Sequence, residues 1–247
     1  MSIGTLPLTD LAPLAVMLPV LGAAVTFMLV RRPRAQITVT VSALVLTLVL
    51  DALLLAAVWD TGVAAVHLGG WPAPLGISLV VDRLSALMLV VSALITLAVL
   101  LYASAQGLIN RDEGGPVSIF HPTFLILVAG VSNAFLAGDL FNLYVGFEIL
   151  LTSSYVLLTM GGTAQRIRAG VTYVVVSVLS SVVFLIAIAM IYAATGTVNM
   201  ADIAAKVPDL PVGTQMQLHL MLLVAFGIKA AVFPLSLWLP DSYPTAP

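Results

Sequence analysis

Two ionisable residues, Glu148 and Lys229, stand inside long apolar segments of the sequence, where a charge demands a chemical explanation. Each lies near the middle of a stretch of about 20 residues, the length that crosses a bilayer. An ionisable side chain at the membrane centre costs about 2.5–3.5 kcal/mol on insertion scales, and such residues commonly mark ion or proton pathways. A buried carboxyl group and a buried amine change their proton affinities when they approach or separate. We therefore expect Glu148 and Lys229 to translocate protons as a pair.

Hydroxyl groups recur at helical spacing around Glu148. Tyr144 and Thr152 stand four residues before and after it, and Tyr155 follows one turn later. Residues at this spacing share one face of a helix, so we expect a polar stripe beside the carboxyl group. The structural alternative is a permanently protonated Glu148 that only hydrogen-bonds between helices.

Pro234 predicts a break in the helix that carries Lys229. A proline donates no backbone hydrogen bond and crowds the carbonyl group four residues earlier, here that of Ala230, so the break is expected one turn past the lysine. Transporters build ion sites at such broken helices in the middle of the membrane. The structural alternative is a lysine that snorkels along apolar surface towards the interface.

The remaining polar residues within apolar segments are more ambiguous. Asp51 has apolar neighbours on both sides, and a packed, protonated structural carboxyl group is as good an interpretation as an ion-path residue. Ser177 and Ser181 are first interpreted as close-packing positions and His219 as an interfacial hydrogen-bonding residue, with an ion path as the second interpretation. Three further charges fall at expected helix ends, where capping or snorkelling explains them: Asp82, Arg83 and Asp139.

The composition defines the medium that surrounds these residues. Of 247 residues, 61% are hydrophobic and 8% are charged, which excludes a soluble globular protein. The apolar runs lack the alternation of barrel strands, so we expect an all-α polytopic membrane protein. The chain has no cysteine, which excludes iron–sulfur clusters and zinc–thiolate sites, and we expect no bound metal or cofactor. A net charge of −2 gives no reason to expect a nucleic-acid partner.

Seven transmembrane helices are predicted within a single domain over residues 1–247. Gly, Pro and charged residues bound the apolar runs and place the helices at about 8–30, 36–59, 80–104, 120–138, 140–160, 168–194 and 215–239. The Gly- and Pro-rich residues 68–78 predict an extended hairpin, and residues 195–214 a polar loop.

The distribution of basic residues predicts the orientation. Alternate joints between the helices carry nearly all the arginines, so these joints are expected on the cytoplasmic side. The N-terminus would then lie outside and residue 247 inside, in a cell membrane. The arginines concerned are Arg31, Arg32, Arg34, Arg111, Arg166 and Arg168.

Two segments carry a specific resemblance. Residues 138–155 (GDLFNLYVGFEILLTSSY) and 227–247 (GIKAAVFPLSLWLPDSYPTAP) resemble the antiporter-like subunits shared by respiratory complex I and Mrp-type cation/proton antiporters. Both segments are most similar to the D-type subunit of the Mrp antiporters, because complex I relatives more often have a histidine where Tyr243 stands. The resemblance implies a fold of about fourteen helices with two inverted repeats. It also implies that Glu148 and Lys229 match the family's charged residues of the fifth and seventh helices.

The resemblance implies a function and leaves rivals open. It implies a membrane subunit of a multisubunit monovalent cation/proton antiporter, with other membrane subunits, lipid, protons and Na⁺ as partners, and not an enzyme in itself. One rival is a proton-pumping subunit of complex I or a membrane-bound hydrogenase; the other is a non-transporting structural subunit. The sequence ends before the second repeat, so we expect it to be an N-terminal half, whose continuation would be needed for transport.

Overall fold

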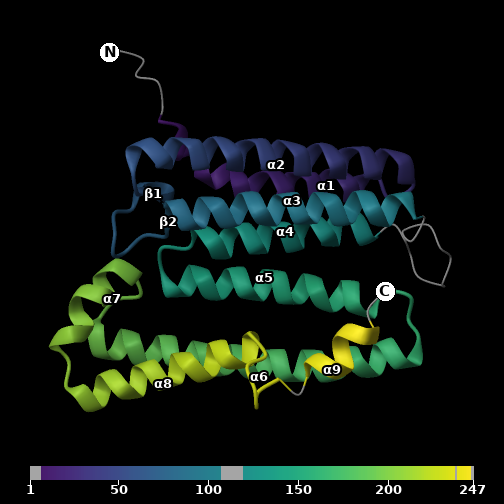
Figure 1. Cartoon of the computed structure of the whole chain (residues 1–247). Helices are drawn as coiled ribbons and strands as arrows, with labels where there is room; N and C mark the ends of the chain where they lie inside the picture. The colour runs from purple at the N-terminus through teal and green to yellow at the C-terminus, as the bar shows by residue number, and fades with distance from the viewer. Residues whose placement is uncertain (1–6, 107–118, 237, 246–247) are drawn as a thin grey trace.

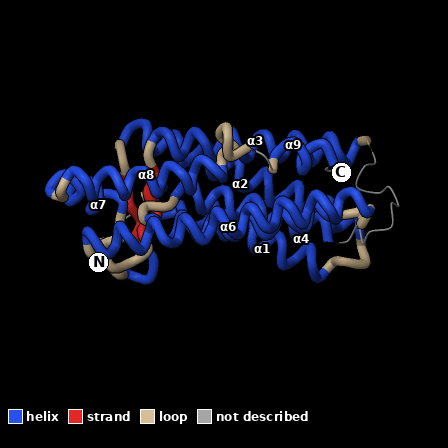
Figure 2. The backbone as a smooth tube through the Cα atoms, turned by 90° about the horizontal axis from the view of Figure 1, so that it is seen from below, coloured by secondary structure: helices blue, strands red, loops and turns tan. Residues whose placement is uncertain are grey.

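The structure is a bundle of long helices lying side by side. It is a computed structural model, and it describes residues 7–106, 119–236 and 238–245. The helices are α1 (Ala12–Met28, preceded by the short helix Leu8–Leu11), α2 (Pro33–Thr61), α3 (Arg83–Ala105), α4 (Phe120–Leu136), α5 (Leu140–Thr159), α6 (Ala164–Thr195), α7 (Met200–Lys206), α8 (Val212–Lys229) and α9 (Leu239–Ser242). Helices α1–α4 form one half of the bundle, α6 and α8 form the other, and α5 lies between them, packed on α4 and α6 (Figures 1 and 2).

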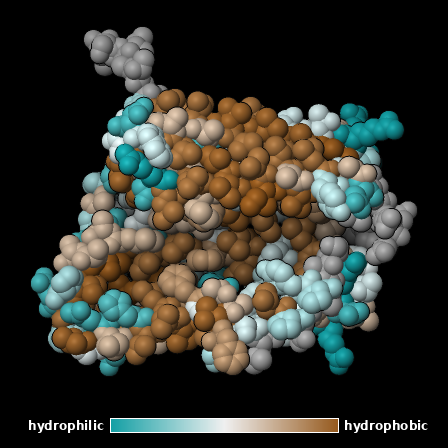
Figure 3. Space-filling model, in the orientation of Figure 1, coloured by the Kyte–Doolittle hydropathy of each residue, from teal (hydrophilic) through white to brown (hydrophobic). Residues whose placement is uncertain are grey.

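The expectation of an all-helical polytopic membrane protein is confirmed. Each of the seven predicted segments holds a helix, and five helices among the described residues are long and apolar enough to cross a membrane. Helix α4 is apolar but shorter. A broad hydrophobic band covers the middle of the bundle, with hydrophilic residues towards both ends (Figure 3). The single-domain boundary remains a prediction, and Arg111 and Pro247 of the predicted orientation lie outside the described residues.

The two ends of the bundle differ, and we name them by what they contain. The hairpin end holds strands β1 (Ala64–His67) and β2 (Ser78–Val81) together with α7, and the joint end holds the connections at residues 29–32 and 160–163 (Figure 1). The strands pair antiparallel, with Ala64 opposite Val81 and His67 opposite Ser78. A hairpin is present as predicted, but its strands flank the predicted residues 68–78, most of which form the connection.

The hairpin end fixes where α5 begins. The Gly138 amide donates to the Ser78 carbonyl at 2.8 Å, and the Met200 amide donates to the Gly138 carbonyl at 3.0 Å. Asp139 then caps α5 by accepting from the Asn142 amide at 2.7 Å, and Asp82 caps α3 in the same way. The predicted capping roles of these two aspartates are confirmed.

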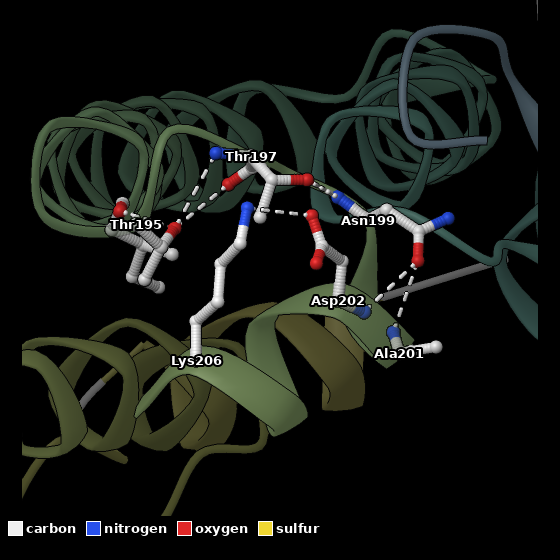
Figure 4. A network of polar contacts seen from close by, with 7 residues as sticks. Thr195, Thr197, Asn199, Ala201, Asp202 and Lys206 are labelled. Carbon is white, nitrogen blue, oxygen red and sulfur yellow. Dashed lines mark hydrogen bonds and ion pairs between the residues drawn. The ribbon is translucent and has the colours of Figure 1, made fainter. Parts of the chain in front are cut away.

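Helix α7 is an element that the sequence did not predict, since residues 195–214 were expected to form a polar loop. The Asn199 side chain caps it by accepting from the Ala201 and Asp202 amides at 3.1 and 3.2 Å (Figure 4). Lys206 bonds Asp202 at 2.9 Å one turn along the helix. The hydrogen bond from Lys206 lowers the pKa of Asp202, and Thr197 contributes further.

The predicted break of the seventh helix near Pro234 is confirmed, but the helix differs in extent from the predicted residues 215–239. Helix α8 begins earlier, at Val212, and ends at Lys229 itself rather than one turn beyond it; α9 resumes the helix at Leu239. The reason is that the proline affects the residues before it. With no amide at Pro234 to bond the carbonyl of Ala230, the helix closes off before that residue.

Candidate functional site

Close packing of α5 on α4 holds Glu148 in place. Gly146 of α5 faces α4 so closely that a Cβ atom there would lie 3.0 Å from the Ala134 amide nitrogen. Gly130 of α4 faces α5 in the same way, since a Cβ atom at this glycine would lie 2.7 Å from the amide nitrogen of Leu150. A side chain at either glycine would push the helices apart. The two glycines therefore fix the helix that carries Glu148 against the other half of the bundle.

Ser181 joins Glu148 to Lys229. It is buried near the middle of α6, and its hydroxyl group donates a short hydrogen bond to Glu148 Oε1. The same hydroxyl oxygen accepts a hydrogen bond from Lys229 Nζ at 3.3 Å. Among the described residues, Glu148 and Lys229 make no direct ion pair within 4.0 Å. The expected pair is therefore a three-membered line, carboxyl–hydroxyl–ammonium.

The end of α8 places Lys229 at the site. The Ala231 amide donates to the Ile228 carbonyl at 3.1 Å, and the Val232 amide to the Gly227 carbonyl at 2.9 Å. Ala231 has φ +51°, so the helix ends in a Schellman motif with an alanine at its left-handed position. Lys229 occupies the last helical position, where the negative end of the helix dipole favours its ammonium group.

Aromatic rings close the hairpin-end side of this line. Phe184 of α6 and Phe226 of α8 lie 5.0 Å apart between ring centroids, and Phe147 of α5 lies 6.2 and 6.3 Å from them. Phe184 is fully buried. Lys229 Nζ stands 4.9 Å from the Phe147 ring centroid, within cation–π range. This aromatic cluster (Phe147, Phe184, Phe226) separates the charged line from the hairpin end.

A cavity opens on the other side of Lys229. Its volume is about 140 Å³, which is large enough to hold water. Polar lining comes from Lys229, Ser177, Ser180 and the aromatic residues Tyr173, Trp238 and Tyr243. The charged line therefore meets space that can hold water towards the joint end and packed rings towards the hairpin end.

Trp238 connects the segment between α8 and α9, which we call the broken segment, to the site. Its indole Nε1 donates to the Ile228 carbonyl at 3.0 Å, one residue before Lys229. Its ring lies 5.2 Å from that of Tyr173, whose hydroxyl group is 3.0 Å from the Ser154 hydroxyl. Sequence reasoning assigned no role to either aromatic residue, since an aromatic residue in an apolar helix carries no signal of its partner.

The other predicted site residues fall in different places. Ser177 is buried and lines the cavity, and Tyr144 packs its ring 6.0 Å from Phe184. Thr152, four residues from Glu148, is exposed while its neighbour Ser153 is buried, and its place in an ion path stays a prediction. His219 is also exposed, well along α8 from Lys229. Pro234 lies in the broken segment, on its exposed side.

Asp51 lies apart from this line, in the α1–α4 half. It is 1% exposed on α2, and neither of its carboxyl oxygens has a hydrogen-bond partner. Asp51 therefore lies away from the residues around Lys229.

Comparison with known proteins places this site in a family. Residues 137–247 match the family described as NADH:quinone oxidoreductase/Mrp antiporter, transmembrane. The match begins just after α4. The matched segment contains both charged residues and the broken α8–α9 region, and the antiporter-like resemblance inferred from the sequence is confirmed.

Relatives of the antiporter-like family match over nearly the whole chain. The D-type subunit of the Na⁺/H⁺ antiporter of Bacillus subtilis is 36% identical over 235 residues, which are 95% of this chain and 47% of the relative. The structure of the Mrp complex from Dietzia sp. DQ12-45-1b has a chain with TM-score 0.85 and 31% identity, covering 98% of this chain and 44% of that one. A chain of the archaeal membrane-bound sulfane sulfur reductase has TM-score 0.87 and 28% identity over 96% of this chain and 48% of that one. The chain thus spans about half the length of the relatives it matches.

Proposed function

We propose that the chain is part of a membrane subunit of a multisubunit monovalent cation/proton antiporter, and that it moves protons through the line Glu148–Ser181–Lys229. The observation that carries the proposal is the Ser181 hydroxyl group, which donates to the carboxyl group of Glu148 and accepts from the ammonium group of Lys229. A hydroxyl group held between an acid and a base can pass a proton in either direction. Both neighbours are ionisable, so proton movement changes charge at each end of the line.

The surroundings of the line support directed transfer. The cavity of about 140 Å³ on the joint-end side offers water to Lys229. The aromatic cluster on the hairpin-end side offers no polar group that would carry a proton onward. In this state Lys229 exchanges protons with the joint end alone. With the predicted orientation, that end faces the cytoplasm of a cell whose membrane also holds the partner subunits.

Na⁺ is the cation we test first, because the Bacillus subtilis relative is named a Na⁺/H⁺ antiporter subunit. The described part of the chain holds no group of three His, Cys, Asp or Glu side chains able to hold a metal ion. Proton movement is the step that we assign to this chain.

The test uses membrane vesicles that contain the complete subunit within its assembled complex. Glu148→Gln keeps the shape of the side chain and removes its ionisable group, so Na⁺-driven proton exchange should fall to background. Lys229→Arg should also fail, since arginine keeps its proton and cannot complete a release step. Asp202→Asn, on the exposed helix α7, serves as the control and should exchange normally.

Two results would reject the proposal. Normal exchange by Glu148→Gln would remove the carboxyl group from the pathway. Normal exchange by Lys229→Arg across the whole pH range would make Lys229 an electrostatic fixture rather than a proton carrier. If both variants assemble and exchange normally, the chain is a structural subunit.

A redox-driven pump is the second candidate, favoured by the similarity to a chain of the sulfane sulfur reductase complex. The two candidates differ in what drives the charged line. Purification of the intact complex under mild conditions distinguishes them: a redox subunit with bound cofactors would favour the pump, and its absence together with Na⁺-dependent exchange would favour the antiporter.

A further inference from the structure

A second set of buried polar residues runs along α2, in the half of the bundle that the Glu148–Ser181–Lys229 line does not enter. Gln36, Thr40, Thr47 and Asp51 recur at four- and seven-residue spacing, which places them on one helix face. Each is 1% exposed or less. We call these four residues the α2 stripe. It begins one turn from the joint end and stops at Asp51.

The joint-end part of the α2 stripe is hydrogen-bonded. The Thr40 hydroxyl donates to the Gln36 carbonyl at 2.8 Å and lies 3.1 Å from Nδ1 of His121 on α4. Gln36 Nε2 donates to the Thr26 carbonyl of α1 at 2.9 Å. His121 is itself 1% exposed. A titratable imidazole thus touches the stripe between its joint end and Asp51.

Asp51 lacks the partners that an ionised carboxylate requires. Neither oxygen of this 1%-exposed side chain has a hydrogen-bond partner. The elements packed against α2 carry titratable or charged groups only near the ends of the bundle among the described residues: Asp10, Arg83, Tyr102 and His121. An isolated buried carboxylate is so costly that the group takes up a proton instead.

Apolar packing closes the stripe beyond Asp51. The next buried residues on the same face, Leu54 and Val58, pack with Leu79 and Val81 of the hairpin strand in one core cluster. No hydroxyl, amide or imidazole group of the stripe continues past Asp51 towards the hairpin end. The stripe is therefore polar towards the joint end and closed towards the hairpin end.

We propose that Asp51 is a second proton-binding site, occupied by a proton and loaded from the joint end along Gln36, Thr40–His121 and Thr47. The proposal stands on the α2 stripe alone and does not rest on the function proposed for Glu148 and Lys229. A proton fits better than a metal ion, because the described residues hold no cluster of ligands around Asp51.

Infrared spectroscopy of the assembled complex in lipid tests whether Asp51 carries the proton. The carbonyl stretching band of a protonated carboxylic acid should be present at neutral pH in the wild type and should lose intensity in Asp51→Asn. The control is Asp82→Asn, because Asp82 lies outside the α2 stripe and its carboxyl group accepts a hydrogen bond of 2.6 Å from the Ser85 amide. Unchanged intensity in Asp51→Asn, or equal losses in both variants, would overturn the proposal.

Exchange in D₂O tests the route. The Asp51 band should shift as the proton is replaced by deuterium. Thr40→Val should slow that shift by at least about tenfold, because a positioned proton-transfer group speeds a reaction roughly 10²–10⁴-fold. Thr96→Val is the matched control, since the Thr96 hydroxyl on α3 bonds only its own helix, at the Ser92 and Ala93 carbonyls. Equal exchange rates in the two valine variants, or a band that never shifts, would reject loading along the α2 stripe.

Discussion

A single hydroxyl group decides how the two central charges communicate. Glu148 and Lys229 each contact Ser181, on the helix that runs between theirs, rather than each other. Their charges are thus coupled through a group that can both donate and accept a proton. An arrangement of this kind is sensitive to the loss of one oxygen atom, which a directly contacting ion pair would not be.

Ser181→Ala should therefore reduce exchange by at least about tenfold while leaving the subunit assembled, as expected for a lost proton-transfer group. Na⁺-driven proton exchange in vesicles measures the effect. Thr172→Ala on the same helix is the control, because the Thr172 hydroxyl is exposed and bonds only the Arg168 carbonyl of its own helix. Exchange at the wild-type rate in Ser181→Ala would mean that protons bypass the hydroxyl group.

At the scale of the element, helix ends position the functional groups. Helix α5 starts at its Asp139 cap, which sets the depth of Glu148, and α8 stops at Lys229 in a Schellman motif. Trp238 binds the Ile228 carbonyl and keeps the broken segment close to the site. Both charges thus depend on where a helix begins or ends, and not only on which face they occupy.

Helix α7 offers a pH-dependent test of an element's local electrostatics. The hydrogen bond from Lys206 lowers the pKa of Asp202. The contribution of Asp202 to the stability of α7 is therefore complete above the unfolded-state pKa of this group, and it is lost as pH falls through the lowered folded-state pKa. Lys206→Met should move the pKa of Asp202 back towards its ordinary value. NMR titration of the Asp202 carboxyl carbon measures this, and an unchanged pKa would show that Thr197 alone maintains the shift.

At the scale of the whole molecule, the Glu148–Ser181–Lys229 line and the α2 stripe each have an apolar cluster on the side that faces the hairpin end. The cavity beside Lys229 and the α2 stripe both lie towards the joint end. The aromatic cluster and the core cluster of Leu54, Val58, Leu79 and Val81 lie towards the hairpin end. In both halves, therefore, the polar groups or cavity face the joint end and the apolar cluster faces the hairpin end, although the residues differ.

Phe184→Ala should open the hairpin-end side, because truncation of a fully buried phenylalanine leaves a cavity beside the charged line. We expect vesicles with this variant to dissipate a proton gradient without added Na⁺, whereas Val182→Ala, at an exposed position of α6, should hold it. A gradient that persists equally in both variants would exclude the aromatic cluster as the barrier.

The orientation of the bundle is tested with single cysteines in this cysteine-free chain. Gln165 at the joint end should react with a membrane-impermeant thiol reagent only from the cytoplasmic side, and Gly213 at the hairpin end only from outside. Both positions are exposed and lie in the first turns of α6 and α8. Labelling of position 165 from outside would reverse the predicted orientation.

Local rules allowed much of the fold to be predicted from the sequence. Apolar length placed a helix in each of the seven segments, the positions of Asp82 and Asp139 at helix ends favoured capping or snorkelling, and the Gly- and Pro-rich residues 68–78 indicated a hairpin. Each of these inferences uses interactions between residues close in sequence, which spacing alone reveals.

Only the tertiary structure decided which residues meet. Ser181, Trp238 and the aromatic cluster join the site across α5, α6 and α8, and no spacing within one helix encodes such contacts. Thr152 shares the Glu148 side of α5 by its four-residue spacing, yet it is exposed, because the packing of neighbouring helices decides which part of that side is covered. The state of Asp51 depended likewise on what lies opposite it: the sequence shows a carboxyl group among apolar residues, and the packing of α1–α4 leaves both of its oxygens without a partner.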